Sequence, residues 1–77
     1  MNAQRRKSIR ELMEQIETIK SDLETLRDEE QEAFDNMPEN LQYSERGEAA
    51  EEAADNLSSA YDSLDEVLEY LESAVEG

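Results

Sequence analysis

The stretch Met37–Glu45, MPENLQYSE, separates two long segments of similar length and contains the only proline of the chain. Apolar residues on both sides of it recur at alternating steps of three and four. This spacing is typical of α-helices that pack along a seam. The first series is Ile9, Leu12, Ile16, Ile19, Leu23, Leu26, a polar Glu30, and Ala33; the second is Ala50, Ala53, Leu57, Ala60, Leu64, Val67, Leu71 and Ala74.

The two series are mirror images about this stretch. If two residues face each other when their numbers add to 83, every member of the first series faces one of the second, from Ile9 with Ala74 to Ala33 with Ala50. The midpoint falls between Leu41 and Gln42. The sequence therefore predicts an all-α, coiled-coil-like antiparallel two-helix hairpin that forms a single domain, residues 1–77.

The first helix is expected over about residues 5–36. Good helix formers fill this segment, and it contains neither Gly nor Pro. Ser8 is the one candidate cap near its start, so residues 1–4 are interpreted as a loose lead-in. Asn36 is expected to end the helix in the left-handed conformation, because Met37 precedes Pro38.

The turn is expected over residues 37–44 and the second helix over about 45–75. Pro38 suits the first turn of a short helical segment, where its missing N–H costs nothing. Ser44 is a suitable N-cap for the second helix, and Gly47 lies in its first turn. Leu41 and Tyr43 are predicted to close the turn end of the seam by packing against it.

The composition argues against catalysis. The 77 residues include no Cys and no His, which removes thiol nucleophiles, imidazole bases and the commonest transition-metal ligands. The Glu-x-x-His pairs of di-iron bundles and the EF-hand spacing are also missing. We therefore expect no enzyme activity, no catalytic residue, no cofactor and no metal. No apolar run is long enough for a signal peptide or a membrane span, so a cytoplasmic protein is expected.

Negative charge dominates the chain and is concentrated in the second helix. The net charge is −15, from 22 acidic and 7 basic residues. Residues 47–77 carry ten acidic residues and no basic one. Such a balance disfavours direct binding to nucleic acid or anionic membranes and favours basic protein surfaces as partners.

The acidic residues of the second helix fall on its outward side. With Ala50 at heptad position a and Ala53 at d, every f position is acidic. We define the acid face by seven acidic residues at its f and b positions: Glu48, Glu51, Asp55, Asp62, Asp65, Glu69 and Glu72. Such a row of carboxylates resembles the phosphates of a duplex and suits the basic groove of a nucleic-acid-binding protein. The alternative is a solvated helix face that provides solubility alone.

A second stripe lies beside the seam, at heptad position e. On the second helix it consists of Ala54, Tyr61, Leu68 and Val75, and on the first of Met13, Lys20, Arg27 and Phe34. Left open to water, the apolar members would form an adhesive patch. Self-association through Tyr61, Leu68, Val75, Met13 and Phe34 is therefore predicted, with a homodimeric four-helix bundle as the product.

The basic residues have two expected roles. In the predicted register Lys20 and Arg27 lie on either side of Tyr61, where a cation–π contact is expected. The remaining cluster is an N-terminal arm, for which nucleic acid or an anionic membrane is one conceivable target. We favour internal neutralisation by acidic residues at the end of the second helix. The arm consists of Arg5, Arg6, Lys7 and Arg10, and the facing acids are Glu69, Glu72 and Glu76.

The segment Asp28–Ala53, DEEQEAFDNMPENLQYSERGEAAEEA, resembles a class of small uncharacterised helical proteins of prophages and mobile elements in Gram-positive bacteria. The likeness is carried by DEEQEAFDNMPENLQ followed by SERGE, about a third of the chain. It implies a phage context, in which small acidic proteins often inhibit host defence nucleases, as anti-CRISPR proteins do. It implies no particular functional residue.

Two functional hypotheses follow. The first is an inhibitor that occupies the basic nucleic-acid groove of a host defence protein through the acid face. The second is a structural or scaffolding coiled-coil module that acts through its apolar seam and e stripe. Salt separates them, because ionic strength weakens a charged interface much more than an apolar one.

Overall fold

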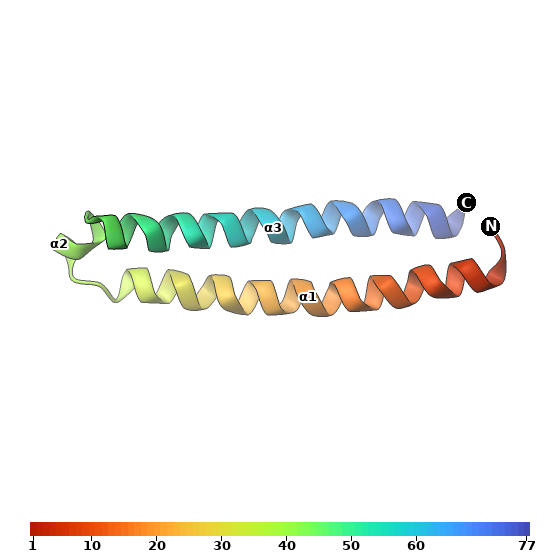
Figure 1. The fold of residues 1–77 in the computed structure, drawn as a ribbon, viewed down its shortest axis with the longest axis horizontal. Coiled ribbons are helices and arrows are strands. Elements are labelled where there is room, and N and C mark those ends of the chain that lie inside the picture. The colour runs from red at the N-terminus through yellow and green to blue at the C-terminus, as the bar shows by residue number, and fades with distance from the viewer.

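The computed structural model describes residues 1–77 and contains three helices, α1 (Ala3–Asp35), α2 (Glu39–Gln42) and α3 (Glu45–Glu76). The long helices α1 and α3 run antiparallel, with α2 at one end and both termini at the other (Figure 1). The Cα trace measures 58 × 15 × 12 Å. The predicted all-α hairpin is therefore confirmed.

Helix α1 begins earlier than its sequence indicated, and its cap was missed. The side chain of Asn2 accepts a hydrogen bond of 2.7 Å from the backbone N–H of Arg5. Asn is among the best N-cap residues because its oxygen satisfies a free N–H of the first turn. Residues 3 and 4 are therefore helical, and Ser8 lies inside the helix rather than at its start.

The turn was predicted correctly in extent but not in detail. Asn36 ends α1 with right-handed backbone angles, φ −85° and ψ −6°, and no residue of the chain has a positive φ. Pro38 is extended and stands immediately before α2, where its carbonyl oxygen accepts the backbone N–H groups of Leu41 and Gln42. The chain thus reverses direction without any residue in the left-handed conformation.

Helix α3 begins as predicted. Ser44 is its N-cap, and its hydroxyl oxygen accepts the N–H of Gly47 at 3.4 Å. Gly47 is buried because the start of α3 presses against the end of α2. A Cβ at this position would lie 2.5 Å from the carbonyl oxygen of Leu41 and closer still to that of Gln42. A glycine is therefore required here by close backbone approach.

The contacts between the long helices agree with the predicted register. Lys20 contacts Tyr61 and Asp65, which flank the position opposite it, residue 63. Near the termini, the guanidinium of Arg6 donates a hydrogen bond of 3.2 Å to the carbonyl oxygen of Val75. A register shifted by a heptad would move each partner about 10 Å along the helix, out of reach.

The seam is rotated relative to the prediction. The most buried apolar residues of the hairpin are Ala50, Ala54, Leu68 and Val75, and three of these four belong to the e stripe of α3. At the d positions, by contrast, Leu12, Ile19, Leu26 and Val67 are 40–50% exposed. The helices therefore pack through a and e positions, and most of the apolar e stripe is covered within the hairpin.

Side-chain size explains the rotation. On α3 the e position holds Tyr61 and Leu68 where the d position holds the smaller Ala60 and Val67. On α1 the e position holds Met13 and Phe34, together with long basic side chains whose stems cover apolar surface. On α3, turning the e stripe inward therefore buries larger apolar side chains than turning the d positions inward.

Leu41 and Tyr43 do not close the turn end of the seam. Leu41, in the single turn of α2, is 40% exposed, and Tyr43, the residue that ends it, is 78% exposed. Met37 is half-buried at this end instead, next to Ala33 and Ala50. The residue directly before Pro38 thus provides the packing expected of Leu41 and Tyr43.

Candidate interaction surfaces

The acid face follows α3 over nearly its whole length. Its f positions recur every seven residues, a spacing of about 10 Å along a helix. All its members are exposed except Asp65, which is half-buried. None but Asp65 takes part in a salt bridge. Six of the seven predicted partner-binding carboxylates are therefore free to contact another molecule.

The charged side chains of α3 are almost all negative. Its 32 residues include eleven acidic side chains and one basic side chain, Arg46, in the first turn. The other cations of the chain lie on α1, and the two that reach across the hairpin are Lys20 and Arg6. The negative field of α3 is therefore little reduced by neighbouring side chains.

Asp65 belongs to an internal cluster instead. The Nζ of Lys20 pairs with its carboxylate and lies 4.7 Å from the ring centroid of Tyr61. The hydrogen bond to Asp65 is the main cause that raises the pKa of Lys20 above its usual 10.5, against an opposing effect of desolvation. Lys20 is buried and fixes the centre of the hairpin, which confirms the predicted cation–π contact.

Arg27 occupies the next e position of α1. Its guanidinium donates to the carboxylate of Asp28 at 3.0 Å and lies 4.0 Å from that of Glu24. The hydrogen bond to Asp28 is the main cause that raises the pKa of Arg27. Its partners are thus on its own helix, which leaves Lys20 as the cation that connects α1 to the acid face.

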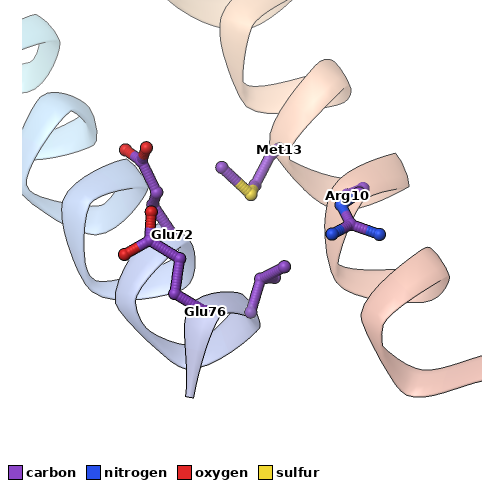
Figure 2. A pocket seen from close by; sticks show the side chains of 5 residues that line it. Arg10, Met13, Glu72 and Glu76 are labelled. Carbon is purple, nitrogen blue, oxygen red and sulfur yellow. The ribbon is translucent and has the colours of Figure 1, made fainter. Parts of the chain in front are cut away.

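A small hollow of about 340 Å³ lies at the open end of the hairpin (Figure 2). Arg10 and Met13 come from α1, and Glu72 and Glu76 from α3; Val75 completes the lining. The basic arm therefore lies beside the acidic end of α3, as its internal neutralisation requires. None of its cations is within 4.0 Å of a carboxylate, so the attraction acts through longer distances.

The predicted self-association residues are mostly inside the hairpin. Leu68 and Val75 are 9% exposed, and Tyr61, Met13 and Phe34 are half-buried between the helices. They build the protomer, so little of their surface remains for a second molecule. The heptad pattern could not show this, because a and d or a and e positions give equally regular stripes.

A different apolar surface is exposed. We call it the apolar face and define it by the d positions of both helices: Leu12, Ile19, Leu26 and Ala33 of α1 with Ala53, Ala60, Val67 and Ala74 of α3. Leu12, Ile19 and Leu26 are each about half exposed. Sequence reasoning had placed all eight in the seam.

The two rows of the apolar face lie on the same side of the hairpin. Near the turn they border one groove of about 400 Å³, in which Ala33 of α1 lies opposite Ala53 of α3. The rows continue from there at seven-residue intervals along both helices. Five more residues line the groove: Glu30, Met37, Arg46, Ala49 and Ala50.

The carboxylates are spread along the helices, and no three of them gather as metal ligands would. Neither long helix has an apolar stretch that could cross a membrane. No protein-family model, curated protein or solved structure matches this chain.

Proposed function

We propose that this protein is a non-enzymatic interaction module that binds a basic protein surface through the acid face of α3. The observation that supports this best is a helix of 32 residues with eleven carboxylates and a single cation, of which one carboxylate alone is engaged in a salt bridge to α1. A helix that needs only solubility usually mixes both signs.

The fitting partner is a protein groove that normally holds nucleic acid. A duplex presents one negative charge about every 1.7 Å of its axis, and Lys and Arg side chains of the groove bind those charges. The acid face is a straight row of carboxylates along a helix, so its negative charges can follow the same groove. Occupation of the groove would exclude the nucleic acid, so the proposed activity is inhibition.

The biological setting of this proposal comes from the resemblance of Asp28–Ala53 to prophage proteins. In that setting the partner is a defence protein of the bacterial host, and the inhibitor acts in the host cytoplasm in the manner of an anti-CRISPR protein. The physical part of the proposal, a basic groove blocked by the acid face, is testable without this setting.

The decisive experiment reverses charge on the acid face. In the triple variant Asp55→Lys, Asp62→Lys, Glu69→Lys, the net charge changes by six, from −15 to −9. We expect it to lose binding to a candidate defence nuclease and no longer to displace duplex DNA from it. Circular dichroism should show unchanged helix content, because these side chains are exposed.

A matched control reverses three exposed carboxylates of α1, Glu11→Lys, Glu14→Lys and Glu32→Lys, with the same change in net charge. The control should bind the nuclease nearly as well as the unmodified protein. Equal loss in both variants would mean that net charge alone matters. Binding that survives the first triple reversal and is insensitive to salt would refute the inhibitor proposal.

A second candidate function is favoured by the exposed apolar face. We propose that the hairpin self-associates, with a homodimeric four-helix bundle as the product, and serves as a structural or scaffolding module. The supporting observation is that the hairpin has no fully buried large side chain, while Leu12, Ile19, Leu26 and Val67 are 40–50% exposed on one face. Sedimentation equilibrium tests this: a protein that stays monomeric at high concentration has no such role.

A further inference from the structure

We propose that the apolar face is the site of a second copy of this chain, stacked antiparallel about a twofold axis that passes beside Ile19. This inference rests on the self-association proposed above and adds the face, the orientation and the residues in contact. It does not depend on the acid face, which lies on another side of α3.

The first argument is the incomplete core of the single hairpin. Its most buried apolar residues are two alanines, one leucine and one valine, and each keeps some contact with solvent. Two helices alone provide one layer, whereas a stable domain requires at least two layers packed around a core. A second hairpin over the apolar face supplies the missing layer.

The second argument is area. The broad side of the molecule, in which α1 and α3 lie next to each other, measures 58 × 15 Å (Figure 1). A copy stacked over its full length would cover roughly 800–900 Å² of each protomer, and specific interfaces bury about 800 Å² per partner. The broad side that carries the apolar face is thus large enough for a stable dimer.

The third argument is charge, and it selects the orientation. The turn half, residues 28–52, carries ten acidic residues and one basic, a net −9, whereas the open end, residues 1–11 with 72–77, carries four basic and three acidic, a net +1. Stacking with both turns together would bring the two most negative regions into contact. The antiparallel arrangement places each turn over the partner's nearly neutral end.

The fourth argument is the symmetry of the large side chains. Leu12 and Leu26 are each seven residues from Ile19, which is the middle residue of α1. A twofold axis beside Ile19 therefore places Ile19 against its own copy and Leu12 against Leu26 of the other protomer. An interface on a twofold axis must be self-complementary in this way.

The same axis serves α3. In the hairpin register Ile19 lies opposite Leu64, so the axis passes α3 close to that residue. It then places Ala60 near Val67 of the other protomer and Ala53 near Ala74, a small side chain opposite a small or medium one. The α3 helices can therefore approach closely while the larger side chains of α1 fill the space between the α1 helices.

The open end also fits the groove at the turn. Arg5 occupies the d position one heptad before Leu12, and the twofold axis brings it over Ala33 of the other protomer. There it reaches Glu30, the half-buried carboxylate that borders the groove. Arg46 lines the same groove and already offsets part of that charge, so the contact contributes to orientation more than to affinity.

The test of the face uses sedimentation equilibrium on the full chain. Ile19→Lys places two cations against each other on the axis and should raise the dimer dissociation constant at least about thirtyfold, as loss of a central contact does. Tyr43→Lys is the control, since it changes an equally exposed large side chain outside the face. A dimer unaffected by Ile19→Lys would overturn the proposal.

The test of the orientation uses single cysteines, which leave the fold intact. Ile19→Cys should form a disulfide-linked dimer in high yield, and a mixture of Leu12→Cys with Leu26→Cys should form the mixed dimer. Leu12→Cys alone should not crosslink, because its two copies would be about 20 Å apart. A dimer in which these yields are reversed would refute the antiparallel axis but leave self-association standing. A monomeric protein would refute both.

Discussion

At the scale of single residues, the structure depends on two side chains in unusual positions. Gly47 is buried between α2 and α3, where there is no room for a Cβ. Lys20 is the one buried charged residue and joins the middle of α1 to Tyr61 and Asp65. The first sets how tightly the chain turns, and the second holds the centre of the hairpin in register.

Gly47→Ala is therefore expected to destabilise the protein, although alanine has the higher helix propensity by about 1 kcal/mol. The added methyl must displace backbone carbonyls, and the free energy of unfolding should fall by about 1–3 kcal/mol, as in other overpacked sites. Urea denaturation measures the change. Ser59→Ala, at an exposed position of the same helix, should have the opposite, slightly stabilising effect.

Because of Lys20, we expect the free energy of unfolding to fall at alkaline pH. Because its pKa is raised in the folded protein, the stabilisation is fully present below the unfolded value of 10.5 and is lost as the pH rises through the folded value. Thermal unfolding of the unmodified protein and of Lys20→Met, measured between neutral pH and pH 11, should show a smaller alkaline loss in the variant. Equal losses would show that the pair with Asp65 does not couple to folding.

At the scale of the elements, the sequence predicted the hairpin, its turn and its register, because the mirrored apolar series and Pro38 allow few other arrangements. It did not predict the rotation of the seam. A straight helix has 3.6 residues per turn, so a stripe of 3.5 drifts, and several neighbouring stripes are acceptable. Which stripe turns inward is decided by side-chain volume across both helices, as Tyr61 and Leu68 illustrate.

At the ends of the helices, too, the sequence predicted some features and not others. Ser44 was identified because a serine before acidic residues is a strong cap signal. Asn2 was missed because no large apolar residue follows it until Ile9, so the apolar pattern did not indicate that the first two turns are helical. The exposed acid face was predicted from periodicity alone. The exposed apolar face was not, because it required the rotation of the seam to be known.

Leu68 and Tyr43 provide a direct test of this seam. Leu68→Ala should lower the free energy of unfolding by about 2–4 kcal/mol, because it removes a well-packed side chain from the hairpin core. Tyr43→Ala should change it by less than about 0.5 kcal/mol, since its ring is 78% exposed. Chemical denaturation of both variants at one protein concentration measures the difference. Similar costs would place Tyr43 in the core and contradict the observed turn.

At the scale of the whole molecule, self-repulsion opposes folding. A net charge of −15 is spread over a thin rod, and only four salt bridges, from two cations, offset it. Neutral salt should therefore stabilise the protein. Raising the ionic strength from about 0.01 M to about 0.1 M shortens the Debye length from about 30 Å to about 10 Å.

We expect this change in salt to raise the free energy of unfolding by about 1 kcal/mol, which corresponds to an increase in Tm of about 4–8 °C for a chain of this size. Thermal unfolding followed by circular dichroism measures it. The triple reversal on the acid face, with its net charge of −9, should show a smaller increase. A Tm that falls with added salt would mean that attractive pairs outweigh the repulsion.

The two termini lie next to each other at one end of the rod (Figure 1). There the Arg6 side chain donates a hydrogen bond to the carbonyl oxygen of Val75. A pulling force applied between them would act across the helix axes and load one layer of contacts at a time. The hairpin would open by unzipping from that end toward α2, at low force and with little cooperativity. Pulled between one terminus and the turn, the force would instead run along a single helix and load its backbone hydrogen bonds, while the contacts between α1 and α3 would not be peeled apart. The molecule is thus easily opened by a force between its termini and stiff against a force along its helix axes.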